Sequence, residues 1–305
     1  MAAELGIGRG AAARPRGGFN PAAAARWVGH FARRKPLGAF GAFMIIALIG
    51  VGTLAPLIAP FDPLKQMVGA QLEGPSARHF LGTDNFGRDM FSRIVWGARI
   101  SMFVAIGVTT LSIIPSTLLG ISCAYFKGWW DMFFQRVVDA TQAVPGLILL
   151  ITIVSVLGNG VWNVIFALAI PRMITGSRIK RAAAFSIAAQ DYVLAAQASG
   201  AGNMRIMLRH VLPNIMATII IVVSLGLGGF ILAEASLSFL GYGIAPPAPS
   251  WGNMMALDAR RFMITAPHMF WAPTIVLSLV IFGVNMFGDA MRDVLDPRLR
   301  GSEQK

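Results

Sequence analysis

Long apolar runs separated by short polar segments dominate this sequence. Residues 36–61, 100–126, 140–171, 211–233 and 262–288 contain no charged residue. Each run reaches the roughly 20 residues that a helix needs to cross a hydrocarbon core of about 30 Å. The third run is long enough to reverse once, and Gly158-Asn159-Gly160 is a turn signal inside it. The pattern predicts an all-α integral membrane protein with six transmembrane helices.

The six helices set the expected domain organisation. We expect the spans at about 36–60, 98–126, 138–157, 161–180, 211–233 and 267–288. With their loops they form one transmembrane domain, residues 36–300, in which the segment 190–213 is the main polar loop. Residues 1–35 are rich in Ala, Gly, Pro and Arg and are expected to be a flexible basic tail. Residues 301–305 form a C-terminal tail.

Composition and charge agree with a membrane protein. The 305 residues are 55% hydrophobic and only 13% charged, and the mean hydropathy is +0.64, outside the usage of soluble domains. The formal net charge of +12 comes from basic residues that border apolar runs. A nucleic-acid binder would cluster them with aromatic residues on one soluble face. Lipid is therefore an expected partner, and nucleic acid is not.

The distribution of Lys and Arg predicts the orientation, because basic residues are retained on the cytoplasmic side of a membrane. With the N-terminus inside, 19 of the 26 basic residues face the cytoplasm and the others face outside. Both termini and the segment 190–213 are therefore predicted to be cytoplasmic.

The segment 192–214 is polar, basic and rich in small residues, although it lies between apolar runs. Two short helical stretches, 192–199 and 203–210, flank Gly200, which can adopt a positive φ and end one helix before the next begins. Arg205 and Arg209 add positive charge beside this bend. We expect a helix–turn–helix knob on which another protein docks. The alternative is an amphipathic loop that only connects two spans.

The spacing within this segment resembles the cytoplasmic coupling loop of ATP-binding-cassette importer permeases. That pattern is Glu-Ala-Ala, three residues, Gly, nine residues, Ile, any residue, Leu-Pro. Leu194 replaces the acidic residue and His210 replaces the isoleucine, so no acidic contact is expected at Leu194. The resemblance implies that the following residues couple the subunit to an ATPase: Ala195, Ala196, Gly200, Ala201, Arg205, Arg209, His210, Leu212 and Pro213. Pro213 is expected to begin the fifth span, where its missing N–H is harmless.

Other motifs resemble the C-type permeases of dipeptide, oligopeptide and nickel importers. A GTD-x-x-GRD signature before the second span is matched by Thr83, Asp84, Gly87, Arg88 and Asp89. Residues 234–255 resemble the external Glu-Ala-x-Leu-Ser-Phe-Leu-Gly segment with its Pro-Pro, Pro-Ser-Trp-Gly continuation, and residues 288–300 resemble the cytoplasmic tail. With RKPLGAF at 34–40, the similarity covers roughly residues 33–300.

The GTD-x-x-GRD segment can also be interpreted from its local sequence, independently of the family. Thr83 or Asp84 can cap a following short helix, and the charged residues from 84 to 93 are spaced for local ion pairs. The apolar side of that helix, which includes Met90 and Ile94, is expected to lie in the membrane interface.

Several single residues remain open to two interpretations. Glu234, at the outer end of the fifth span, has either a structural role or direct contact with substrate. In the structural role it is hydrated or pairs with Arg260 or Arg261. Trp251 and Trp271 are interfacial anchors or ligand platforms.

Catalytic chemistry is not expected in this subunit. The sequence contains neither a phosphate-binding loop nor a Cys/His metal cluster, and we find no nucleophile–base constellation. Cys123 is expected to be a small packing residue. Asp139, beside Arg136, is either a packing residue or a proton carrier. The middle of each predicted span lacks charge, which argues against an ion-coupled secondary transporter.

The resemblance implies one subunit of a bacterial or archaeal ATP-driven importer, multi-pass in the cytoplasmic (inner) membrane. Its implied partners are a second homologous permease that completes a heterodimer, two ATPase subunits that hold ATP and magnesium, and an external solute-binding protein. Dipeptides or oligopeptides are the expected cargo. A permease for nickel or another small solute is the alternative within the family. An ion-coupled transporter and a structural or assembly protein are the rivals outside it. No substrate-binding residue is assigned.

Overall fold

A computed structural model describes Arg33 and residues 35–295 of the chain. The predicted tails, apart from Arg33 and Lys35, lie outside the described residues, as do the last five residues of the segment 288–300. Contacts divide the chain after Pro36, and the description below concerns the unit that begins at Leu37. Its described part is built from helices, which confirms the predicted all-α fold class.

Four long apolar helical runs are each long enough to cross a membrane. They are α2 (Pro36–Thr53), α4 (Met90–Phe126), the continuous run Asn203–Phe239, and α14 (His268–Leu295). Four predicted spans correspond to these helices, and all of them except α2 extend beyond their charge-free runs. For example, α4 begins at Met90 because the Asp89 carboxylate accepts a 2.8 Å hydrogen bond from the Ser92 N–H. The capping residue is therefore neither Thr83 nor Asp84, which corrects the prediction.

The predicted third span, 138–157, is not one straight helix. The structure has α5 (Gly128–Ala143) and α6 (Gly146–Leu157), with a bend of 92° between them. Pro145 explains the break, because its ring disfavours helical geometry in the preceding residue, and Val144 is extended with φ −86° and ψ 129°. The predicted turn after α6 is confirmed, since Gly158 and Gly160 both have positive φ.

The predicted fourth span, 161–180, is divided between α7 (Val161–Thr175) and α8 (Ser177–Ala188). The 15 residues of α7 rise only about 22 Å, less than a hydrocarbon core. Among the described residues, four helices therefore qualify as spans, or five if the bent α5–α6 pair counts as one.

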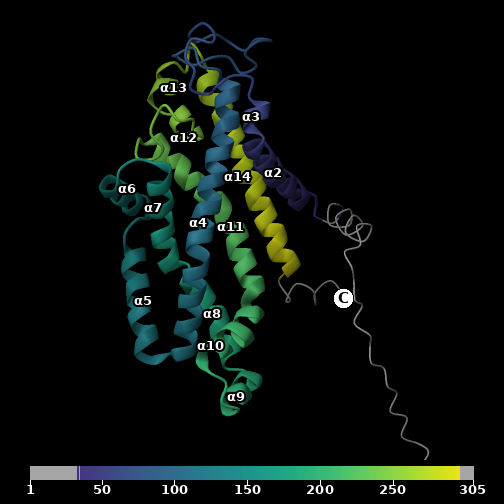
Figure 1. Ribbon diagram of the computed structural model, residues 1–305, viewed down its shortest axis with the longest axis vertical. Coiled ribbons are helices and arrows are strands. Elements are labelled where there is room, and N and C mark those ends of the chain that lie inside the picture. The colour runs from purple at the N-terminus through teal and green to yellow at the C-terminus, as the bar shows by residue number, and fades with distance from the viewer. Residues whose placement is uncertain (1–32, 34, 296–305) are drawn as a thin grey trace, which may run out of the picture. The chain divides into compact units, whose positions relative to one another are not determined.

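Short helices gather at the two ends of the long ones (Figure 1). One end carries α9 (Asp191–Ala198) and α10 (Asn203–Ile206), which we call the knob end. The opposite end carries α3 (Ala55–Ile58), α12 (Trp251–Met254), α13 (Leu257–Arg261) and the loop 59–89. The long run that starts at α10 becomes α11 (Met216–Phe239) and connects the two ends.

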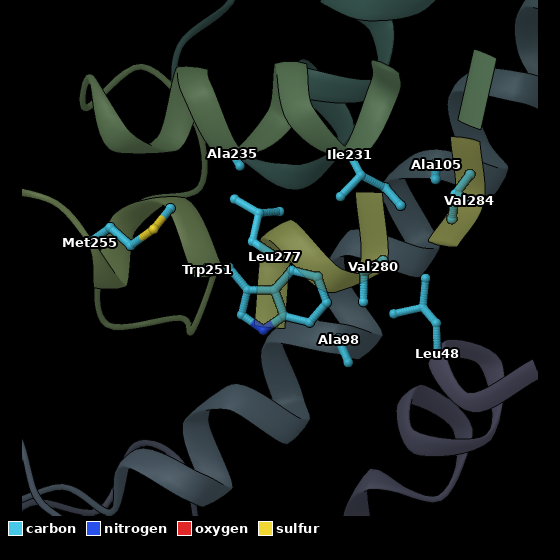
Figure 2. Packing of buried hydrophobic residues seen from close by; sticks show 10 residues of the cluster. All are labelled: Leu48, Ala98, Ala105, Ile231, Ala235, Trp251, Met255, Leu277, Val280 and Val284. Atoms are coloured by element: carbon cyan, nitrogen blue, oxygen red, sulfur yellow. The ribbon is translucent and has the colours of Figure 1, made fainter. Parts of the chain in front are cut away.

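The packed interior is centred on α4 and α11. α4 packs against α7, α8 and α11, and α11 also packs along α14. Figure 2 shows the Trp251 indole surrounded by small and aliphatic side chains of these helices. Trp251 is 1% exposed and its Nε1–H donates to the Ile94 carbonyl at 3.0 Å, so both predicted roles for it, interfacial anchor and ligand platform, are wrong. Gly97 permits this packing, because a Cβ there would lie 2.8 Å from the indole ring.

Candidate functional site

The knob, residues 190–213, forms where α9 ends and α10 begins. Gly200 has φ +79°. Its N–H donates to the Gln197 carbonyl at 2.9 Å, and the Ala201 N–H donates to the Ala196 carbonyl at 3.1 Å. This pair of bonds is a Schellman motif, which ends a helix at a left-handed residue. The predicted bend at Gly200 is confirmed, and a Cβ there would meet nothing within 4 Å.

Apolar side chains fasten the knob to three long helices. Val193 of α9 and Ile206 of α10 are both 0% exposed. They belong to one buried cluster with Ile121 of α4, Ala184 of α8 and Ile219 of α11. Because interiors of this kind are close-packed, the knob is anchored firmly to these helices.

Tyr125, next to the end of α4, adds a polar link to both halves of the knob. Its hydroxyl donates to the Asn203 side-chain oxygen at 2.9 Å and accepts from the Gln197 amide at 3.2 Å. Sequence reasoning missed Tyr125. Its only signal was a polar aromatic residue close to the end of an apolar run.

The predicted coupling residues lie on one continuous segment, and most of them face outward. Ala195, Gly200, Arg205, Arg209 and Pro213 are exposed, whereas Ala196, Ala201, His210 and Leu212 are half-buried. Arg205 and Arg209 form no ion pair with any residue that the structure describes.

Large apolar side chains stand among these small and basic residues. Leu194 is 49% exposed, Met204 is 60% exposed and Leu208 is 42% exposed. Leu194 occupies the position where the family pattern has an acid. The surface is therefore apolar with positive charge at its edge, a composition suited to protein contact.

Pro213 lies inside a continuous helical run rather than at the start of a span, which corrects the expectation. A π-helical turn, Met207–Val211, precedes a 3₁₀ turn, Leu212–Ile215, and α11 follows without a break. Departures from α-helical hydrogen bonding of this kind accommodate the missing N–H of proline. The second half of the knob, from Asn203 onward, and α11 therefore form one continuous helical run.

Glu234 lies near the other end of α11 and is 0% exposed. Its carboxylate accepts hydrogen bonds from three serine hydroxyls, Ser238 and Ser250 at 2.8 Å and Ser101 at 3.2 Å. The suggested pairing with Arg260 or Arg261 is not formed. Those two guanidinium groups lie over the rings of neighbouring aromatic residues, Phe239 and Phe262.

The loop 59–89 is held by buried charged groups at the same end. Asp84 pairs with Arg88 at 2.6 Å and with Arg93 at 3.6 Å, so the predicted local ion pairs are confirmed for Asp84. Asp89 instead contacts His79 at 2.9 Å. Met90 and Ile94 are buried, and their predicted place in the membrane interface is wrong.

Charged residues also lie inside the helical bundle, contrary to the expectation that mid-span regions lack charge. Lys180 is 2% exposed and its ammonium donates to the Ser116 hydroxyl. The Arg172 guanidinium lies 5.7 Å from the centre of the Phe230 ring. Charge inside the bundle therefore does not distinguish an ATP-driven importer from an ion-coupled transporter.

Two ion pairs join α5 to α8. Asp139 accepts from Arg178 and lies 3.6 Å from Arg136, but its side chain is 45% exposed, so the predicted packing role is wrong and the pair lies at the surface of the subunit. Asp131 accepts two hydrogen bonds from the guanidinium of Arg181.

Comparison with known proteins identifies the family. Residues 116–301 match the family described as binding-protein-dependent transport system inner membrane component. The dipeptide transport system permease protein DppC of Alkalihalophilus pseudofirmus is 38% identical over 268 residues, covering 88% of each chain. The glutathione transport system permease protein GsiD of Escherichia coli O157:H7 is 38% identical over 270 residues, covering 88% of this chain and 89% of GsiD. The chain belongs to this family of membrane permeases of ATP-binding-cassette importers.

Proposed function

We propose that this chain is one transmembrane subunit of an ATP-driven importer of peptides. The outward-facing knob, built from small residues and anchored to α4, α8 and α11, is the observation that carries the proposal. The two relatives named above are permeases for a dipeptide and for glutathione, itself a short peptide. Peptides are therefore favoured over nickel or another small solute.

In this proposal the chemistry takes place in separate ATPase subunits, which hold ATP and magnesium. The knob docks on one ATPase through the surface that contains Leu194, Gly200 and Met204. When the ATPases close on ATP, the knob moves with its ATPase, and the buried contacts of Val193 and Ile206 carry that motion into the long helices. The pathway then opens alternately between this subunit and a second, homologous permease.

The topology that we propose has the knob end and both termini in the cytoplasm of a bacterial or archaeal cell. Six crossings of the inner membrane satisfy this arrangement, with the bent α5–α6 pair as the third and α7 continuing into α8 as the fourth. The external solute-binding protein then docks at the opposite end, beside α12 and α13. The excess of basic residues near the knob end supports this orientation.

Reconstitution of the whole complex tests the proposal. The subunit, its second permease and the two ATPases are placed in sealed vesicles, with the loaded binding protein on one side and ATP on the other. Labelling of single cysteines at Gly202 and Ile264, in a Cys123→Ser background, reports which end faces each compartment. We expect peptide uptake only with ATP on the Gly202 side. Uptake that continues without ATP and stops when an ion gradient is dissipated identifies a secondary transporter instead.

A further inference from the structure

A cavity of about 540 Å³ lies between α5, α6, α7 and α11. Arg172 supplies the only charged side chain among its described lining residues. Polar atoms come from Thr141, Gln142 and Thr175, and Phe230 lies on the side formed by α11. None of the motifs recognised in the sequence includes these residues.

The cavity opens on the surface of this subunit, since Gln142, Val144, Gly146 and Gly229 of its lining are exposed and Arg172 is half-buried. Arg172 is close to Gly226 and Phe230, and Gly226 lies near the middle of the 24 residues of α11. Since a helix rises 1.5 Å per residue, the guanidinium lies at a level about 15 Å from the start of α11 and about 20 Å from its end. That depth corresponds to the centre of a hydrocarbon core of about 30 Å.

Arg172 forms no ion pair with any residue that the structure describes. No carboxylate lines the described part of the cavity, and the carboxylates on two of its helices have other partners, since Asp139 of α5 accepts from Arg178 and Glu234 of α11 accepts from serines. A narrower space beside the cavity is lined by Lys180 as well as Arg172, so the positive charge is reinforced rather than cancelled. An unpaired arginine at membrane depth is costly against lipid, which favours a water-filled cavity that receives an anion.

We propose that Arg172 is a carboxylate-binding subsite in the translocation pathway, where it binds the terminal carboxylate of a peptide in transit. This inference rests on the proposed function of the chain. The planar guanidinium fork matches a carboxylate with two parallel hydrogen bonds. Leu149, Leu150 and Leu168 give the cavity an aliphatic surface. Such a surface can contact peptide side chains of different kinds, because it requires no particular hydrogen bond from them. An acidic side chain of the second permease is the other source of a carboxylate.

The test compares a dipeptide that has a free carboxylate with the same dipeptide as its C-terminal amide. Uptake of each is measured in the reconstituted complex at concentrations that saturate the binding protein, for the parent chain and for Arg172→Ala. Saturation removes the selectivity of the binding protein. The parent should take up the free acid faster than the amide. Arg172→Ala removes both hydrogen bonds of the fork and should lower that ratio by at least about tenfold, the effect of losing one charge-assisted hydrogen bond.

Two further variants keep the test decisive. Arg172→Lys retains the charge without the fork and should give an intermediate ratio, even if Arg172→Ala assembles poorly. Arg136→Ala is the matched control, because it removes the same side chain and the same charge. The Arg136 side chain is 78% exposed and does not line the cavity. Its ratio should equal that of the parent.

Equal slowing of both peptides in Arg172→Ala would overturn the inference, because it would indicate that Arg172 pairs with protein rather than with cargo. An unchanged ratio in Arg172→Lys together with unchanged uptake would also overturn it. If the parent complex shows no ATP-dependent uptake of either peptide, the proposed importer function is wrong. That outcome differs from one in which the parent transports peptides but Arg172 has no effect on the ratio.

Discussion

The helical run from Asn203 to Phe239 ends in two contrasting ways. At the knob end, the bend at Gly200 is open and a Cβ there would touch nothing. At the opposite end, Glu234 is completely enclosed and three serine hydroxyls donate to it. One end therefore exposes groups that nothing in residues 35–295 covers, whereas the other end satisfies its polar groups internally.

This difference separates a surface for a partner from a structural polar centre. A buried carboxylate needs hydrogen bonds from its own chain to remain in the interior, and Glu234 obtains them from α4, α11 and the residue before α12. The exposed apolar side chains of Leu194 and Met204 need no hydrogen bonds from the chain, and they remain available for contact with a partner. Mutations at the two ends should therefore affect different measurements, stability at one end and ATPase coupling at the other.

The largest effect on stability is expected from Glu234→Ala. The substitution removes the acceptor of three buried hydroxyl groups and leaves a cavity, so we expect a loss of about 2–4 kcal/mol. Thermal unfolding of the purified subunit in detergent measures this loss as a fall in Tm. The matched control is Ser236→Ala on the same helix, because that hydroxyl only bonds back to the Leu232 carbonyl at 2.7 Å.

The comparison between the two variants decides the role of Glu234. If Glu234→Ala and Ser236→Ala unfold at the same temperature, the three hydrogen bonds contribute no stability. A stable Glu234→Ala subunit with lost transport would instead favour the alternative in which Glu234 contacts substrate.

Much of the fold could be predicted from the sequence, because charge-free runs of membrane length have few alternatives to spanning helices. The length of an apolar run does not predict where the backbone bends within it. The run 140–171 contains Pro145 near its start, and that residue bends α5 away from α6 by 92°. Hydropathy reports only how apolar the residues are, so it does not predict that a single residue such as Val144 is extended.

The knob was predictable since its signal is local. Gly200 and the small residues around it specify a bend through their own conformational preferences. Trp251 was interpreted wrongly, and Arg172 was counted only as one of the basic residues on the cytoplasmic side, because the environments of both come from distant segments. Burial of Trp251 depends on Gly97, more than 150 residues earlier in the chain, and the cavity around Arg172 is assembled from four helices.

An intermediate effect is expected from Gly200→Val. A β-branched residue at φ +79° is strained by about 1–2 kcal/mol, and this strain should distort the knob while the rest of the fold persists. The matched control is Gly202→Val, because Gly202 is equally open but has an ordinary φ of −66°. Retention of ATPase subunits during purification, and ATP-driven uptake, are compared for the two variants.

Both substitutions add the same bulk to the exposed surface, so the difference between them isolates the effect of the bend. Gly200→Val should lose more ATPase than Gly202→Val. Equal losses would show that docking depends on bulk alone, and normal assembly with normal transport in both would remove the knob from the coupling mechanism.

The smallest effect on stability is expected from the double variant Arg205→Ala with Arg209→Ala. Both side chains are exposed and pair with no described carboxylate, so the Tm should change little. Binding of the ATPase should weaken more, because charges at the edge of an interface act on its formation. Salt screens such charges. ATPase retention by the parent should therefore fall as salt rises, whereas retention by the double variant should be low and nearly independent of salt. A double variant with the parent's salt dependence would show that these two arginines do not contact the ATPase, and a large fall in Tm would place them in the fold of the knob instead.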